Sequence, residues 1–237
     1  MVYSWLKNNL SLLLPQVCQL CGDITGGSNV GLCRACHDAL PSMPLGCMRC
    51  ANPLSSSNKS DKLLCGHCLK QPPAYDDTIA LFPYQQPIDS LVQALKFRHQ
   101  LNHGLLLAKL MARHLADKQA SADCIIPVPL HSTRLRQRGF NQALELARPI
   151  SKKLNIPIDS HSCRRRHDTQ SQSSLPLDQR KQNVRYAFVV KPCRYEHVAI
   201  VDDVMTSGHT VNALATALKH QGVKKVSVWT CCRAYIR

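Results

Sequence analysis

One stretch of sequence decides the fold: Val198-Ala199-Ile200-Val201-Asp202-Asp203-Val204-Met205-Thr206-Ser207-Gly208-His209-Thr210. Its first four residues are apolar and predict a buried strand, and the two carboxylates follow where we expect the strand to leave the sheet. Small and hydroxyl-bearing residues then lead into a helix with an apolar face made of Val211, Leu214 and Leu218. The stretch therefore predicts a strand, a loop and a helix, the repeating unit of open parallel sheets.

The loop after this strand is suited to a phosphate. Ligands of open parallel sheets bind at the carboxyl ends of the strands, where backbone N–H groups and a helix N-terminus attract anions. A carboxylate repels a phosphate, so Asp202 and Asp203 need a different role, and accepting hydrogen bonds from a ribose diol fits them. The alternative is an Asp-Asp pair that only caps a helix.

This thirteen-residue pattern resembles the phosphoribosyl-pyrophosphate loop of the type I phosphoribosyltransferases. The resemblance implies that Asp202 and Asp203 hold the ribose 2′ and 3′ hydroxyls. It also implies that one of these carboxylates orients the substrate Mg²⁺ or helps to stabilise oxocarbenium charge. The residues implied to bind the 5′-phosphate are Met205, Thr206, Ser207, Gly208, His209 and Thr210.

Strands and helices alternate through the rest of the C-terminal part. Apolar residues at helical spacing predict helices at 88–98 and 105–115, and a third helix begins near Asn141 and is ended or kinked by Pro149. Further strands are expected near 124–128, 161–164, 186–190 and 225–230. This order predicts an α/β fold, with a mainly parallel sheet flanked by helices.

Eight of the thirteen cysteines form four C-x-x-C pairs: Cys18/Cys21, Cys33/Cys36, Cys47/Cys50 and Cys65/Cys68. Each pair can occupy a tight turn, and two turns complete a tetrahedral shell of four thiolates. The surrounding sequence is poor in large apolar residues, so metal binding would supply the missing stability. We predict two structural Zn²⁺ ions in a small N-terminal module.

Disulfides and redox-active C-x-x-C sites are the alternatives. The chain shows no export signal, which disfavours disulfides, and a redox site would have one such pair within a βαβ unit. Sequential pairing, first pair with second and third with fourth, is preferred over an interleaved arrangement, which the spacing leaves open. Buried thiols are expected for the other cysteines, Cys124, Cys163, Cys193, Cys231 and Cys232.

The N-terminal segment 1–14 is predicted to be an amphipathic helix. It contains one lysine, Asn8 and Asn9 interrupt it, and no signal-peptide cleavage site follows. No apolar run is long enough to span a membrane, so we expect a cytoplasmic protein. The predicted domains are 1–72, the helix plus a double zinc-ribbon module, and 73–237, the phosphoribosyltransferase-like domain.

Several motifs together point to a narrower family. Besides the four cysteine pairs they are Ala94-Leu95-Lys96-Phe97, Ile126-Pro127-Val128-Pro129-Leu130, Arg136-Gln137-Arg138-Gly139-Phe140-Asn141-Gln142, and the stretches 164–170 and 180–183. With these motifs the chain resembles the competence protein F family, whose members combine zinc ribbons with a phosphoribosyltransferase domain.

This resemblance implies two further site segments. The loop 129–141 takes the place of the pyrophosphate-binding loop, with arginine forks suited to diphosphate oxygens, and its site residues are Leu130, Arg136, Arg138 and Gly139. The basic stretch 164–170 takes the place of the flexible catalytic loop, which makes Arg166 a catalytic residue together with Asp202 and Asp203. The alternative for that stretch is a solvated basic loop that binds nothing.

The formal net charge of +15 also constrains the partners. Two zinc ions held by eight thiolates lower it to about +11. The remaining charge favours phosphates or nucleic acid as partners, and the alternative is a basic surface that only aids solubility.

Two functions follow. The first is a phosphoribosyltransferase-type protein that binds phosphoribosyl pyrophosphate and Mg²⁺, linked by the resemblance to DNA uptake, competence or the use of external DNA. The second is a non-catalytic accessory of DNA uptake that binds single-stranded DNA and the uptake machinery, with the fold as a ligand-binding platform. The aromatic fraction of 5% argues against a base-stacking platform. A pyrophosphokinase, which uses a similar loop, is disfavoured, because that enzyme normally has two tandem copies of the fold and this chain has room for one. The acceptor base and the oligomeric state cannot be read from the sequence.

Overall fold

The computed structural model describes residues 16–25, 31–54, 63–166, 187–192 and 194–235. The chain forms two compact units, Met1–Pro41 and Ser42–Arg237, and each unit contains one set of four paired cysteines. The predicted helix at 1–14 lies outside the described residues. The predicted domain boundary after residue 72 stays a prediction.

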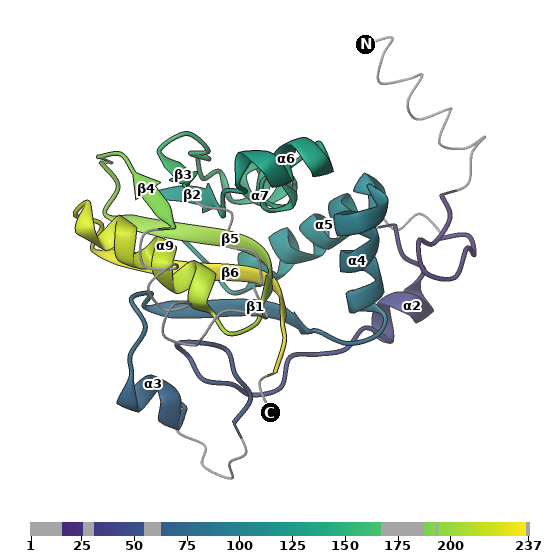
Figure 1. The fold of residues 1–237 in the computed structure, drawn as a ribbon. Coiled ribbons are helices and arrows are strands. Elements are labelled where there is room, and N and C mark those ends of the chain that lie inside the picture. Colours follow the sequence, from purple (N-terminus) through teal and green to yellow (C-terminus); the bar gives the residue numbers. More distant parts are fainter. Residues whose placement is uncertain (1–15, 26–30, 55–62, 167–186, 193, 236–237) are drawn as a thin grey trace, which may run out of the picture. The chain divides into compact units, whose positions relative to one another are not determined.

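A sheet of four parallel strands forms the centre of the second unit (Figure 1). The strands are β1 (Asp77–Pro83), β2 (Cys124–Pro127), β5 (His197–Met205) and β6 (Lys225–Arg233), in the order β1-β6-β5-β2. The two central strands, β5 and β6, are buried along almost their whole length. A strand buried on both faces needs a helical layer on each side.

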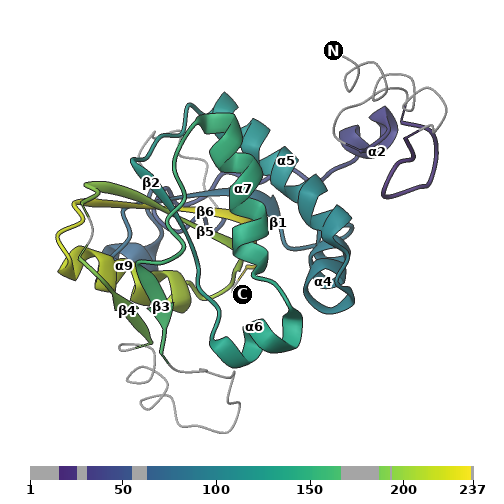
Figure 2. The ribbon, with the colours of Figure 1, turned by 90° about the horizontal axis from the view of Figure 1, so that it is seen from above.

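Helices supply these two layers. They are α4 (Ile88–Arg98), α5 (Leu101–Asp117), α7 (Gln142–Leu154) and α9 (His209–His220). Figure 2 shows α5 and α7 on one side of the sheet and α9 on the other. Leu146 and Ile150 of α7 and Leu214 and Leu218 of α9 are fully buried. The predicted α/β fold with a parallel sheet flanked by helices is therefore confirmed.

A separate pair of antiparallel strands, β3 (Cys163–Arg165) and β4 (Phe188–Val190), lies beside α9. These are the strands expected near 161–164 and 186–190. They do not join the parallel sheet. Phe188 and Val190 instead pack into the same buried cluster as Leu214 and Leu218.

Three local predictions differ from the structure. Pro149 does not end its helix, because α7 continues to Leu154, and the alternative of a kink at Pro149 stays a prediction. The segment predicted to be a loop, 129–141, contains a seven-residue helix, α6 (Ser132–Arg138). The edge strand β1 was not predicted.

A short helix begins within the second cysteine pair of each cluster, with the first cysteine of that pair as its N-cap: α2 (Arg34–Asp38) after Cys33 and α3 (Gly66–Lys70) after Cys65. Within the part of the chain that the structure describes, no helix is long and apolar enough to cross a lipid bilayer.

Candidate functional site

Two buried carboxylates lie near the carboxyl end of β5. The sequence placed Asp202 and Asp203 where the strand ends, but the strand continues to Met205, and both side chains are almost fully buried within it. Each is fixed by the next residue, because the backbone N–H of Asp203 donates to Asp202 Oδ1 (2.9 Å) and that of Val204 donates to Asp203 Oδ1 (2.8 Å). The pair is therefore held rigidly before any ligand binds.

Lys96, in the last turn of α4, forms an ion pair with the second carboxylate. Its Nζ lies 2.8 Å from Asp203 Oδ2, and its side chain is only 22% exposed. Burial lowers the pKa of Lys96, but the charge of Asp203 and the bond to it outweigh burial and raise the pKa above its ordinary value. The sequence placed this lysine in a family motif, Ala94-Leu95-Lys96-Phe97, but not in the site.

Asp202, the first carboxylate of the pair, holds a proton more tightly than an ordinary aspartate. Burial raises the pKa of Asp202 to about 7, the negative charge of Asp203 adds to the rise, and Lys96 opposes it. A hydroxyl donor or a divalent cation beside Asp202 would favour its charged form. The pair can therefore accept hydrogen bonds from a diol or bind a cation near neutral pH.

The loop from Met205 to Thr210 joins β5 to α9. Met205 is buried, whereas Thr206, Ser207 and His209 are exposed to solvent. The first helical bond of α9 runs from the Asn212 N–H to the Gly208 carbonyl, so the N–H groups just before it have no partner one turn back. The His209 N–H donates to Ser207 Oγ (3.5 Å). Exposed hydroxyls and the N–H groups of a helix N-terminus together form a site for an anion.

Gly208 is required by the backbone of this loop. Its φ is +77°, and a Cβ there would lie 2.9 Å from Met205 Cε and 3.2 Å from the Tyr75 hydroxyl. Only glycine adopts this conformation freely, and it also leaves room for the two neighbours.

The helix α6 brings an arginine toward the carboxylates. Arg138 lies in its last turn, with the guanidinium 5.9 Å from the centre of the Phe97 ring. Burial lowers the pKa of Arg138, and the charge of Asp203 opposes that effect. Gly139 ends α6 with a φ of +75°, while Arg136 is exposed. Arg138 therefore lies near enough to Asp203 for the two charges to interact.

The α6 segment is anchored to the edge of the sheet that carries the acidic pair. Asn141 Nδ2 donates to the Val128 carbonyl (3.1 Å), and Asn141 Oδ1 accepts the Ala143 N–H (3.0 Å). β2 ends beside β5, with Pro127 opposite Val201. Half-buried Leu130 follows at the start of the same segment. The carboxyl ends of both strands therefore meet at one site.

The predicted catalytic loop is described only at its start. Arg166 is exposed directly after β3, and its N–H donates to the Ala187 carbonyl (2.8 Å). The remainder of that loop, from 167 to 175, and the motif at 180–183 lie outside the described residues. The role of Arg166 stays a prediction.

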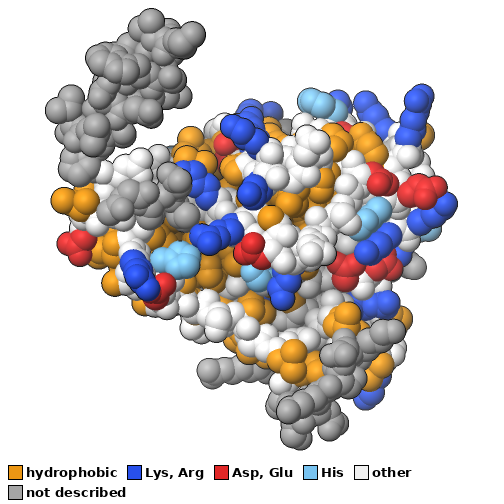
Figure 3. All heavy atoms as spheres, turned by 180° about the vertical axis from the view of Figure 1, so that it is seen from behind, with side chains coloured by type: hydrophobic (Ala, Val, Ile, Leu, Met, Phe, Trp, Pro, Cys, Tyr) orange, Lys and Arg blue, Asp and Glu red, His pale blue; other side chains and the backbone are white. Residues whose placement is uncertain are grey.

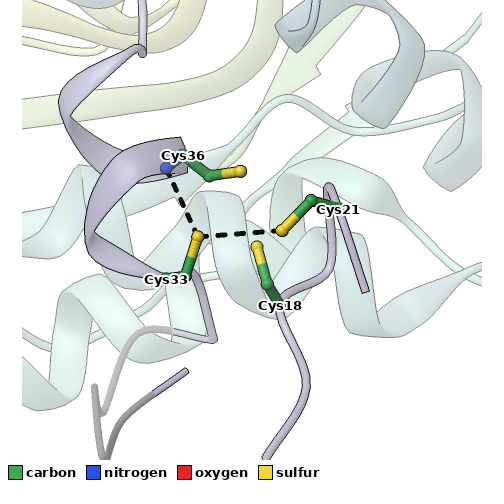
Figure 4. Close-up of side chains that lie close together, drawn as sticks. All are labelled: Cys18, Cys21, Cys33 and Cys36. Carbon is green, nitrogen blue, oxygen red and sulfur yellow. Dashed lines mark hydrogen bonds between the residues drawn. The ribbon is translucent and has the colours of Figure 1, made fainter. Parts of the chain in front are cut away.

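The first cysteine cluster consists of Cys18, Cys21, Cys33 and Cys36. Figure 4 shows the four sulfurs pointing toward one another, with Cys33 and Cys36 at the start of α2. Their sulfurs all lie within 4.8 Å of one another, and those of Cys21 and Cys33 are 3.7 Å apart. The hydrogen bonds among these thiols raise the pKa of Cys36 to about 12.

The second cluster repeats this arrangement with Cys47, Cys50, Cys65 and Cys68. Its Cys50 and Cys65 sulfurs are 3.7 Å apart, and the Cys68 N–H donates to Cys65 Sγ, as the Cys36 N–H does to Cys33 Sγ. A tetrahedral Zn²⁺ with Zn–S bonds of about 2.3 Å sets sulfurs about 3.8 Å apart. A bound divalent cation would also offset the electrostatic repulsion among four neighbouring thiolates. Both clusters are therefore consistent with zinc ribbons, and the predicted sequential pairing is confirmed.

The other described cysteines, Cys124, Cys163, Cys231 and Cys232, are buried as predicted. Cys193 lies outside the described residues.

Comparison with known proteins gives matches along most of the chain. Residues 9–71 match the double zinc ribbon domain, and residues 140–235 match the phosphoribosyl transferase domain. Competence protein F of Haemophilus influenzae is 34% identical over 213 residues, which cover 86% of this chain and 91% of that protein. DNA utilization protein YhgH is 35% identical in Shigella flexneri and 34% identical in Escherichia coli K12. Each of these two matches spans 229 residues, 94% of this chain and 99% of the relative.

Proposed function

Because the chain belongs to the family of competence protein F and the YhgH proteins, with a double zinc ribbon and a phosphoribosyltransferase domain, we propose that it binds phosphoribosyl pyrophosphate together with Mg²⁺. The observation that carries the proposal is the buried pair Asp202 and Asp203, which lies directly before a hydroxyl-rich loop at the N-terminus of α9.

The chemistry of each part suits one part of this ligand. The ribose 2′ and 3′ hydroxyls donate to the two carboxylates, and the 5′-phosphate binds the loop from Met205 to Thr210. The diphosphate extends toward α6, where Arg138 supplies a forked donor. The bound Mg²⁺ neutralises diphosphate charge, and Asp202 or Asp203 can orient it.

The same arrangement supports transfer. In such a displacement the bond from the anomeric carbon to the diphosphate oxygen breaks, an acceptor nucleophile bonds to that carbon, and pyrophosphate leaves, through an oxocarbenium-like state. The contribution of this chain would be to position the ribose and to place the carboxylates near the developing positive charge. Arg138 would hold the departing pyrophosphate, and we assign Arg166 to the same step.

We further propose that each cysteine cluster binds one Zn²⁺, which stabilises a segment that has few apolar residues to bury.

The names of the relatives, competence and DNA utilization, lead us to extend a role in using external DNA to this chain. The second candidate is a non-catalytic accessory that binds single-stranded DNA, and the net charge of +15 favours it. In Figure 3, however, lysine and arginine side chains are spread over the face shown, with hydrophobic and acidic side chains between them. The described residues on that face form no continuous basic track.

Titration calorimetry with phosphoribosyl pyrophosphate and Mg²⁺ tests the first candidate. We expect binding by the wild type and its loss in Asp202→Asn/Asp203→Asn. Glu196→Gln is the matched control, because this exposed carboxylate lies just before β5, at the opposite end of the strand. Absence of heat from the wild type would remove the proposal.

Two further measurements separate the candidates. Pyrophosphate release in a screen of acceptor bases would establish transfer. DNA binding that weakens steeply with salt and is unchanged in the Asp202→Asn/Asp203→Asn variant would favour the accessory role.

A further inference from the structure

One buried side chain contacts both the second cysteine cluster and the candidate phosphate loop. Arg233, the last residue of β6, is only 3% exposed. Its Nε donates to the Cys50 carbonyl oxygen (2.8 Å), and its Nη1 donates to the carbonyls of Met205 (3.0 Å) and Thr206. The guanidinium therefore joins the backbone of a cluster cysteine to the first two residues of the loop.

The segment that follows the cluster is attached to the same loop and helix. The Ala74 N–H donates to Asn212 Oδ1 (2.7 Å) in the first turn of α9. The neighbouring Tyr75 is buried with its hydroxyl beside Gly208, and it shares a core cluster with Cys50 and Met205.

The first turn of the second cluster is also bonded to the sheet. The N–H of Thr78, in β1, donates to the Met48 carbonyl (3.1 Å), and its Oγ1 donates to the Arg49 carbonyl (2.6 Å). Met48 and Arg49 lie between Cys47 and Cys50. The backbone of the turn is thus held by β1 on one side and by Arg233 on the other.

A buried guanidinium is stable only while its donors have acceptors. The Cys50 carbonyl is one such acceptor, and its position depends on how the four cysteine sulfurs are held. A bound metal would fix these sulfurs in one geometry, and its loss would release them. Arg233 would then transmit that change to the Met205 and Thr206 carbonyls.

We propose that Arg233 is a positioning residue through which the metal-bound second cluster orders the 5′-phosphate loop. The affinity of this loop for a phosphorylated ribose therefore depends on the second cluster and not on the first. The linking contacts all lie within the compact unit Ser42–Arg237, to which the first cluster does not belong. The statement about affinity rests on the proposed function of the loop, whereas the link itself is a property of the fold.

Matched cysteine variants of the full-length chain test the dependence. Cys65→Ala/Cys68→Ala removes half of the second cluster and leaves the Cys50 backbone unchanged, and Cys33→Ala/Cys36→Ala does the same in the first cluster. Both should lose one zinc per chain. Calorimetry with phosphoribosyl pyrophosphate and Mg²⁺ should show affinity about tenfold weaker for the first variant and unchanged for the second.

Arg233→Lys tests the link without touching a cysteine. Lysine retains the charge. A single ammonium, however, cannot donate to the Cys50 carbonyl and to the loop carbonyls at once, as the planar guanidinium of Arg233 does. We expect weaker affinity of the folded protein, zinc content close to that of the wild type, and a lower thermal midpoint, because buried carbonyls lose a donor. A purely structural role would lower the thermal midpoint and leave the affinity of the remaining folded protein unchanged.

Hydrogen exchange of the amides from Met205 to Asn212 gives a readout that needs no ligand. Exchange should accelerate in Cys65→Ala/Cys68→Ala and in Arg233→Lys, and stay as in the wild type in Cys33→Ala/Cys36→Ala. Unchanged exchange after loss of the second zinc would overturn the inference. A wild type that binds no sugar diphosphate would overturn the proposed function alone, and the exchange experiment would still decide the link.

Discussion

At the scale of single residues, Lys96 forms its ion pair with Asp203 and acts on Asp202 only from a greater distance. Lys96 contacts Asp203, whereas Asp202 is buried beside a negative neighbour. The sequence predicted both carboxylates from their place after an apolar strand. It could not predict Lys96, which is 106 positions earlier than Asp202, because a contact between distant segments leaves no local pattern.

The affinity for phosphoribosyl pyrophosphate and Mg²⁺ should rise with pH through about 7. Burial raises the pKa of Asp202 to about 7, so this carboxyl is neutral below that value, and the ligand requires its charged form. Because the folded-state pKa is raised, Asp202 stabilises the free protein at low pH, and that contribution is lost as the pH rises through about 7.

Calorimetry between pH 6 and 8, in buffers of different ionisation enthalpy, measures both the affinity and the protons released on binding. Asp202→Asn should bind weakly at every pH and release no proton from this site. An affinity of the wild type that stays flat across this range would contradict the assignment.

Lys96 and Asp203 should be energetically coupled. Lys96→Met leaves a buried carboxylate without its cation, and adding Asp203→Asn removes the unpaired charge. Urea unfolding should therefore give a coupling of about 1–2 kcal/mol between the two substitutions.

The control for this cycle is Lys224→Met with Glu196→Gln. That pair is as close, at 2.7 Å, but both side chains are about 70% exposed, and we expect additive effects. Additivity in the Lys96–Asp203 cycle would show that the buried ion pair contributes no more than the exposed one.

At the scale of elements, the sequence predicted the strand-loop-helix of β5 and α9 well because its pattern is local. The apolar strand, the hydroxyl-rich loop and the helical spacing of apolar residues can each be recognised from residues that are neighbours in the sequence. The elements it missed depend on tertiary contacts. β1 contains alternating buried residues and ends at Pro83, and it becomes a strand by pairing with β6. Polar α6 has no buried residue, and anchoring at Asn141 holds its segment.

Substitutions of three glycines should separate backbone strain from crowding. Gly66→Ala, where the φ is ordinary and no atom is near, should change the free energy of unfolding by less than about 0.5 kcal/mol. Gly139→Ala meets an unfavourable φ in open space and should cost about 1–2 kcal/mol. Gly208→Ala meets the same φ and also crowds Met205 and Tyr75, so it should cost at least as much and weaken ligand binding as well.

Urea unfolding of the three variants and ligand calorimetry check this order. Binding by Gly208→Ala at wild-type affinity would show that the loop tolerates a side chain where it is expected to approach the phosphate.

At the scale of the whole molecule, the eight paired cysteines were predicted from spacing alone, since C-x-x-C geometry is local. Spacing could not show that the second cluster lies in the same compact unit as the parallel sheet. That arrangement comes from contacts of Arg233, Tyr75 and Thr78. Arg233 lies far from the cysteines in the sequence, and Tyr75 and Thr78 belong to no motif. The family resemblance predicted a zinc module and a phosphoribosyltransferase-like domain. The contacts add that the second cysteine cluster of the zinc module is bonded to the candidate site.

Every acceptor that Arg233 contacts across this junction is a main-chain oxygen, at Cys50, Met205 and Thr206. A carbonyl oxygen is present whatever side chain its residue bears. Substitutions at positions 205 and 206 can therefore accumulate through descent without a compensating change at 233. The connection can be inherited intact while leaving no trace of paired substitutions, so it has to be looked for in coordinates rather than in co-varying columns of related sequences.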